Sequence, residues 1–147
     1  MNNYFTINEL CQSDTANNNN IDNTAPNDIK CNLYKLIEFL NPLREQWGSA
    51  IKVTSGYRSP ELNKLLNGSN TSAHLYGFGV DLVPMNGNID EFKSFVKEYL
   101  ADKQFDQYID EASKTSSWVH IGLFYLDGMT QRREFLKYRN GKYMYIN

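Results

Sequence analysis

The chain is organised around Ser72-Ala-His-Leu-Tyr-Gly-Phe-Gly-Val-Asp81, which sets His74 and Asp81 seven residues apart across a glycine-rich turn. The apolar residues around Asp81 are typical of a strand. The other histidine of the chain, His120, lies in a second strand-like run, residues 117–122. Two imidazoles and one carboxylate, with a fourth position left to water, are a common ligand set for catalytic zinc. The sequence therefore predicts one Zn²⁺ ion held by His74, Asp81 and His120.

Each of these residues has an ordinary explanation when it is taken alone. His74 fits a loop histidine, Asp81 a carboxylate at a strand end, and His120 a hydrogen-bonded histidine in the core. The three together, within their flanking motifs, favour a metal site. Imidazole and carboxylate ligands also accept other divalent ions, so the pattern leaves the identity of the metal open.

The pattern Ser-x-His-x-x-Gly-x-x-x-Asp resembles the first metal motif of the D-Ala-D-Ala carboxypeptidase-type zinc peptidases of bacterial cell walls. The Trp-x-His run ending at His120 resembles the second motif. Residues 53–59, Val-Thr-Ser-Gly-Tyr-Arg-Ser, and the opening at residues 4–10, Tyr-Phe-Thr-Ile-Asn-Glu-Leu, are also similar to that family. The likeness is greatest to small single-domain phage and prophage members and covers nearly the whole chain.

The resemblance implies a hedgehog/D-Ala-D-Ala peptidase-like fold in a single catalytic domain, residues 1–147. It also implies a zinc metallopeptidase of carboxypeptidase or endopeptidase type that cuts peptidoglycan stem peptides or cross-links. An endolysin-like role in cell wall degradation follows from the likeness to phage members.

A zinc peptidase also needs a general base. Many members of the resembled family carry an acid three positions before the last histidine ligand, but this chain has Ser117 there. We assign the role to Glu111, with Asp110 as the alternative; the ordinary explanation for a lone glutamate is a solvated surface acid. The resemblance further implies that Arg58 faces the substrate and supports its carbonyl or carboxylate, whereas an unrelated surface arginine would pair with a carboxylate.

Four further residues are candidate substrate contacts: Ser55, Tyr57, Ser72 and Gln107. Tyr57 fits packing equally well. Strand alternation places Gln107 and Ile109 on the face of Glu111, and Tyr108 and Asp110 on the opposite face.

The composition bounds the class of protein. A chain of 147 residues with 41% hydrophobic and 22% charged residues fits one soluble domain. The net charge of −2 gives no basic footprint and disfavours nucleic-acid binding. Neither a signal peptide nor a membrane-spanning run is visible, so we expect a protein that is kept in the cytoplasm and reaches the wall after release. We also expect a monomer, although the sequence itself does not reveal the oligomeric state. Cys11 and Cys31 are expected to be buried free thiols.

The periodicity predicts an α+β domain, with helices packed on one side of a mainly antiparallel sheet. Helices are expected from Thr6 through Leu10, over about 27–47, from Pro60 to near Gly68, and over about 88–101, with Pro42 kinking or restarting the second. Strands are expected over residues 50–55, 78–84, 105–111 and 118–125. The dipeptide Asn140-Gly141 predicts a hairpin between strands at 135–139 and 142–146. Residues 13–26 are expected to form a loop.

Two other functions stay open. The missing acid at residue 117 is the one feature that favours a non-catalytic binding or phage structural module, because a zinc site on such a fold does not by itself mean peptidase activity. An intracellular dipeptidase would need a closed pocket.

Overall fold

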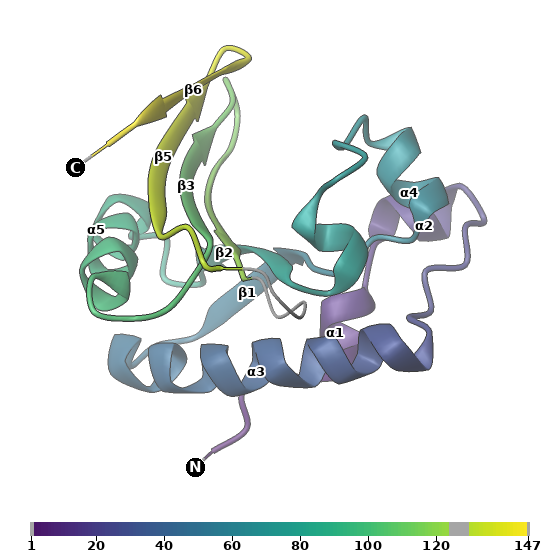
Figure 1. Cartoon of the computed structure of the whole chain (residues 1–147), viewed down its shortest axis with the longest axis horizontal. Helices are drawn as coiled ribbons and strands as arrows, with labels where there is room; N and C mark the ends of the chain where they lie inside the picture. The colour runs from purple at the N-terminus through teal and green to yellow at the C-terminus, as the bar shows by residue number, and fades with distance from the viewer. Residues whose placement is uncertain (1, 124–129, 147) are drawn as a thin grey trace.

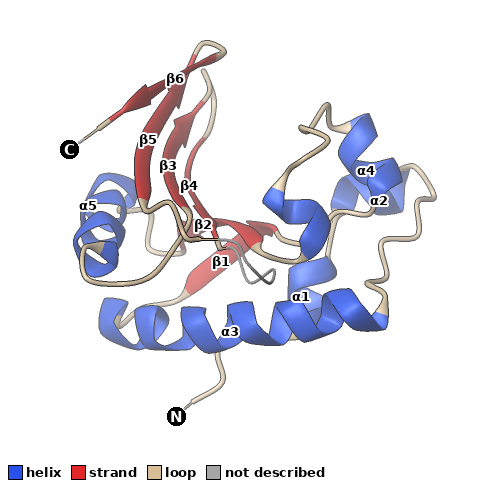
Figure 2. Ribbon diagram, viewed as in Figure 1, coloured by secondary structure: helices blue, strands red, loops and turns tan. Residues whose placement is uncertain are grey.

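The computed structural model describes residues 2–123 and 130–146, and it shows an α+β domain (Figures 1 and 2). Its helices are α1 (Ile7–Cys11), α2 (Asp14–Asn18), α3 (Asn27–Trp47), α4 (Pro60–Leu65), the short 3₁₀ helix η1 (Ala73–Tyr76) and α5 (Ile89–Leu100). Its strands are β1 (Ile51–Ser55), β2 (Gly79–Pro84), β3 (Gln107–Ala112), β4 (Ser117–Gly122), β5 (Glu134–Arg139) and β6 (Lys142–Tyr145). The expected strand over 118–125 extends beyond the described residues.

The six strands form one sheet in the order β1-β2-β4-β3-β5-β6. All neighbouring pairs are antiparallel except β3 and β5, which pair in parallel. The prediction of a mainly antiparallel sheet is therefore confirmed. Because β4 lies between β2 and β3, the strands that carry Asp81, His120 and Glu111 are direct neighbours.

The apolar face of the sheet packs against α3 and α5. The buried stripe of α3 includes Leu33, Leu36 and Leu40, whose spacing places them on one side of the helix. Val80 and Leu82 of β2 join them in the same core. In Figure 2, α3 runs beneath β1 and β2, while α2 and α4 lie together away from α5. On the opposite face of the sheet, Asp81, Glu111 and His120 line a groove.

Several local predictions can be compared directly with the structure. Residues 13–26 are not all loop, since α2 begins after Ser13, whose hydroxyl accepts a hydrogen bond from the Ala16 amide. Ser13 is therefore the N-cap of α2, and this cap stabilises a single helical turn within a polar segment. Helix α3 is not restarted at Pro42 but runs through it and ends at Gly48, which has a left-handed φ of 78°.

The hairpin and cysteine predictions have different outcomes. Asn140 and Gly141 have φ values of 52° and 79°, as expected of a tight turn between β5 and β6. Both cysteines are free thiols, but Cys31 is exposed and Cys11 is only partly buried. The burial prediction for Cys31 is wrong because this residue lies on the solvent side of α3. Over the described ranges, no helix has the length and apolar character required to cross a membrane.

Candidate active site

The pairing of β2 with β4 builds the centre of the site. Asp81 is the register partner of His120, and His120 is in turn opposite Ile109 on β3. Side chains of paired residues project from the same face of a sheet. Asp81 and His120 therefore meet on the groove face, and the His120 Nδ1 atom lies 2.9 Å from Asp81 Oδ1.

His74 reaches the same point from η1. The Ser72 hydroxyl accepts a hydrogen bond from the His74 amide at the start of this turn. Gly77 ends the turn with a φ of 76°. The chain then passes so close to the start of this turn that a Cβ on Gly79 would lie 2.8 Å from the backbone nitrogen of His74. These two glycines allow a histidine loop and the Asp81 strand to lie against each other.

The tautomer of His74 follows from its backbone partner. Its Nδ1 atom lies 2.7 Å from the Gly56 carbonyl oxygen. A carbonyl only accepts hydrogen bonds, so Nδ1 is the donor and the neutral ring has its lone pair on Nε2. That Nε2 atom lies 3.4 Å from Asp81 Oδ1. A backbone acceptor that fixes the ring in this way is typical of metal-ligating histidines.

The three side chains fit a zinc ion. Each of His74, Asp81 and His120 is buried, and one potential ligand atom from each lies within 4.8 Å of the others. Zinc–nitrogen bonds of about 2.0–2.1 Å place neighbouring tetrahedral ligand atoms about 3.3 Å apart. The separations of 3.4 Å and 2.9 Å bracket this value.

The electrostatics of the group suit a cation. Burial alone would raise the pKa of Asp81, but the charges and hydrogen bonds of the two histidines lower it well below its usual range. Burial lowers the pKa of His74. An ionised carboxylate and a neutral imidazole are the forms that bind metal. Burial also acts to lower the pKa of His120, yet its hydrogen bond to Asp81 raises it overall. A metal ion would replace that shared proton.

Arg58 extends over the edge of this group. One guanidinium nitrogen lies 3.7 Å from Asp81 Oδ2, and the side chain is 17% exposed. The Arg58 Nε donates a hydrogen bond to the Ser55 hydroxyl, 3.1 Å away, and the Arg58 amide donates to the His74 carbonyl. Ser55 therefore orients the guanidinium toward the groove.

Glu111 and Asp110 point to opposite faces of β3. Glu111 lines the groove beside Tyr138 and Tyr143. Burial raises the pKa of Glu111, and the negative charge of Asp81 raises it further. A carboxylate with a raised pKa is better suited to accept and release a proton near neutral pH. Asp110 instead forms ion pairs with Lys93 and Arg139, at 2.5 Å and 2.8 Å, and is not among the groove-lining residues.

The comparison with protein families decides where this chain belongs. The profile of the family described as Peptidase M15 matches residues 3–122, a segment that contains all three candidate ligands together with Arg58 and Glu111. The chain belongs to the peptidase M15 family. This family comprises zinc peptidases and includes D-Ala-D-Ala carboxypeptidase-type members. No curated protein matches the chain.

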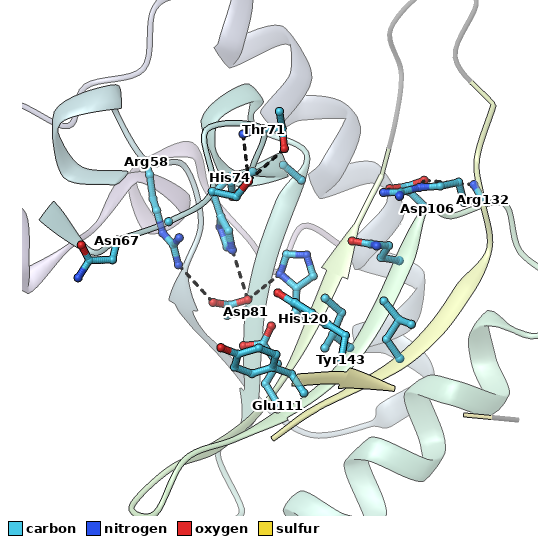
Figure 3. Close-up of a pocket in the computed structure, with 18 residues that line it drawn as sticks. Arg58, Asn67, Thr71, His74, Asp81, Asp106, Glu111, His120, Arg132 and Tyr143 are labelled. Atoms are coloured by element: carbon cyan, nitrogen blue, oxygen red, sulfur yellow. Dashed lines mark hydrogen bonds and ion pairs between the residues drawn. The ribbon is translucent and has the colours of Figure 1, made fainter. Parts of the chain in front are cut away.

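In this M15 protein the candidate metal ligands His74, Asp81 and His120 lie between two cavities, of about 520 Å³ and 640 Å³. Both are lined by Arg58 and Asp81, so they meet at the candidate metal site. The first cavity, shown in Figure 3, contains Ser72 and Gln107 in its lining. The second is lined by Ser55 and Tyr57, and Tyr57 is otherwise packed into the core.

Two parts of the first cavity were not predicted from the sequence. Tyr138 and Tyr143 come from the β5–β6 hairpin, which lies beyond the residues matched by the M15 profile. Asp106 and Arg132 form a bidentate ion pair at the opposite wall (Figure 3). The dipeptide Asn140-Gly141 predicted the hairpin, but no feature of the sequence predicted that β5 pairs with β3.

Proposed function

We propose that this protein is a zinc-dependent peptidase that hydrolyses amide bonds in peptidoglycan stem peptides or cross-links. One observation carries the proposal: the buried His74, Asp81 and His120 group opens onto a groove that Glu111 and Arg58 also line. Membership of the M15 family supports the peptidase activity. The bacterial wall substrate, the phage-type lytic role and the hedgehog-like fold rest on the motif resemblance.

A zinc ion at this site would supply Lewis-acid activation of the substrate carbonyl and of a water molecule. His74 keeps the tautomer that leaves Nε2 available, because its Nδ1–H group donates a hydrogen bond to the Gly56 carbonyl oxygen. Glu111 takes a proton from the attacking water and delivers it to the leaving amine. Arg58, oriented by Ser55, stabilises negative charge that develops on the carbonyl oxygen.

The shape of the groove supports cleavage inside a peptide. Each cavity has a volume in the range of small-molecule binding pockets, and they extend from the metal site in two directions. A carboxypeptidase requires only a short closed pocket on one side. Among the described residues, the only other cation that lines the second cavity is Lys52, three residues before Ser55 on β1. That spacing corresponds to about 10 Å along a strand, so a carboxylate bound there belongs to a residue well past the cleaved bond.

The test is digestion of purified peptidoglycan with the zinc-loaded protein, followed by mass spectrometry of the released peptides. Glu111→Gln, which keeps the size of the side chain, serves as the matched control. We expect the wild type to release cleaved stem peptides, and we expect Glu111→Gln to bind zinc equally well without releasing them. Equal products from both proteins would retain the peptidase and remove Glu111 from the role of base.

The same digestion separates the alternative functions. Stoichiometric zinc with no cleavage by either protein would point to a non-catalytic module on this fold. Cleavage of free D-Ala-D-Ala but not of peptidoglycan would indicate a dipeptidase. Stem peptides with amidated and free C-termini distinguish the two peptidase types, because only a carboxypeptidase requires the free carboxylate.

A further inference from the structure

The terminal hairpin places two tyrosines in line with the proposed base. Strand β5 pairs in parallel with β3 so that Tyr138 is opposite Glu111, and β6 then sets Tyr143 opposite Tyr138. Register partners share a face, so the three side chains form a row across the groove face. The two tyrosine rings lie 4.6 Å apart between centroids. In Figure 3, Tyr143 lies beside Glu111, on one side of Asp81 and His120.

Tyr143 faces the groove with an available hydroxyl. Its side chain is 60% exposed and lines the same cavity as the candidate metal ligands. Within residues 2–123 and 130–146, no hydrogen bond involves the Tyr143 hydroxyl. The hydroxyl of Tyr145, two residues further along the same strand, already donates to Glu134 at 2.8 Å. Of these two tyrosines of β6, Tyr143 therefore has a hydroxyl that can donate to a ligand, whereas the Tyr145 hydroxyl already donates to Glu134.

The charges near Tyr143 determine which partner it suits. Partial burial raises its pKa, and the negative charge of Glu111 raises it further. The phenol consequently stays protonated at neutral pH and acts as a donor. A carboxylate of the substrate would be repelled by Glu111, whereas a neutral peptide carbonyl is not.

We propose that the β5–β6 hairpin forms a substrate subsite in which the Tyr143 hydroxyl donates a hydrogen bond to a backbone carbonyl of the bound peptide. The ring of Tyr138 packs beside the Tyr143 ring on the same face of the sheet. This inference rests on the proposed peptidase function, and it assigns a role to a segment outside the residues matched by the M15 profile.

The experiment compares Tyr143→Phe with Tyr145→Phe, each of which removes one hydroxyl from β6. The wild type and both variants are assayed on a synthetic stem peptide that the wild type cleaves. We expect Tyr143→Phe to lower kcat/KM by about tenfold, which is the loss of one hydrogen bond to substrate. We expect Tyr145→Phe to change it by less than about twofold. Zinc content and melting temperature should be unchanged in Tyr143→Phe, which separates substrate contact from a structural effect.

A binding measurement keeps the inference distinct from the proposed activity. The affinity of Glu111→Gln for a synthetic stem peptide, whether or not the wild type cleaves it, is measured by calorimetry with and without Tyr143→Phe. We expect binding to weaken when the hydroxyl is removed, and this result would hold even if the protein cleaved nothing. Unchanged affinity together with an unchanged kcat/KM would overturn the subsite, as would equal effects of the two tyrosine substitutions.

Discussion

Asp110 forms the centre of a charged group on the face of β3 opposite Glu111, and its removal should destabilise the fold strongly. Its Oδ1 atom lies 2.5 Å from Lys93 Nζ and 2.8 Å from an Arg139 guanidinium nitrogen. Lys93 is buried in the middle of α5, where its Nζ also donates to the Ser117 hydroxyl. Asp110→Ala would leave the Lys93 charge buried without its carboxylate partner.

The expected loss can be estimated from the burial of the pair. Removing one partner of a buried ion pair costs about 3–5 kcal/mol. The side chains of Lys93 and Asp110 are 10% and 19% exposed, and Lys93 keeps the Ser117 hydroxyl, so we take the lower end of this range. A loss of about 3 kcal/mol corresponds to a decrease in melting temperature of roughly 6–12 °C for a domain of this size.

A double-mutant cycle provides the assay. The free energy of unfolding is measured by urea denaturation for the wild type, Asp110→Ala, Lys93→Met and the double variant. Because Lys93→Met removes the unpaired charge, the double variant should be more stable than the sum of the single effects predicts, by about 0.5–3 kcal/mol. Additive losses, or a loss below about 1 kcal/mol in Asp110→Ala, would refute this account of the ion pair.

The ion pairs of Asp110 also predict that the free energy of unfolding depends on pH. Burial acts to raise the pKa of Asp110, but hydrogen bonds and charges from Lys93 and Arg139 lower it overall. A carboxyl with a lowered folded pKa contributes its full stability above its unfolded pKa of about 3.9, and loses it as pH falls through the folded value. The stability difference between wild type and Asp110→Asn should therefore be constant from about pH 5 to 7 and shrink below about pH 4. A gap that persists at low pH would contradict the assigned charge state.

Three further predictions concern the site and the core. His120→Ala removes one of the three candidate zinc ligands, so we expect the purified variant to contain far less than one zinc per chain, measured by inductively coupled plasma mass spectrometry. Retention of one zinc per chain would argue against this ligand set. Arg58→Lys keeps the positive charge but removes the Nε–H group that donates to the Ser55 hydroxyl. We expect kcat/KM for the cleaved peptide to fall by about a hundredfold while the zinc content is unchanged. An unchanged kcat/KM would show that Arg58 has no part in the reaction. Leu82→Ala empties a fully buried position in β2 and should lower the free energy of unfolding by about 2–5 kcal/mol in urea denaturation, whereas the exposed Leu65→Ala should cost far less.

The parts of the fold that follow from local sequence were predictable. The spacing of Leu33, Leu36 and Leu40 fixes the buried side of α3, and Asn140-Gly141 fixes the hairpin turn. Both signals act over a few residues, where backbone and side-chain preferences determine the geometry directly. α2 was missed because a single helical turn capped by Ser13 leaves no periodic signal in a polar segment.

The groove wall was not predictable, because it depends on strand pairing between distant segments. The positions of His74, Asp81 and His120 were inferred from motif types rather than from geometry, and the β2–β4 register is what brings two of them together. Tyr143 reaches the site only because β5 pairs in parallel with β3, beside Glu111, and not at the other edge of the sheet beside β1. β4 separates β3 from β5 in the chain, so no hairpin turn in the sequence marks their parallel pairing. The metal motifs in the sequence therefore predict the candidate ligands and the proposed base, whereas the tyrosines beside them follow only from the order of the strands in the sheet.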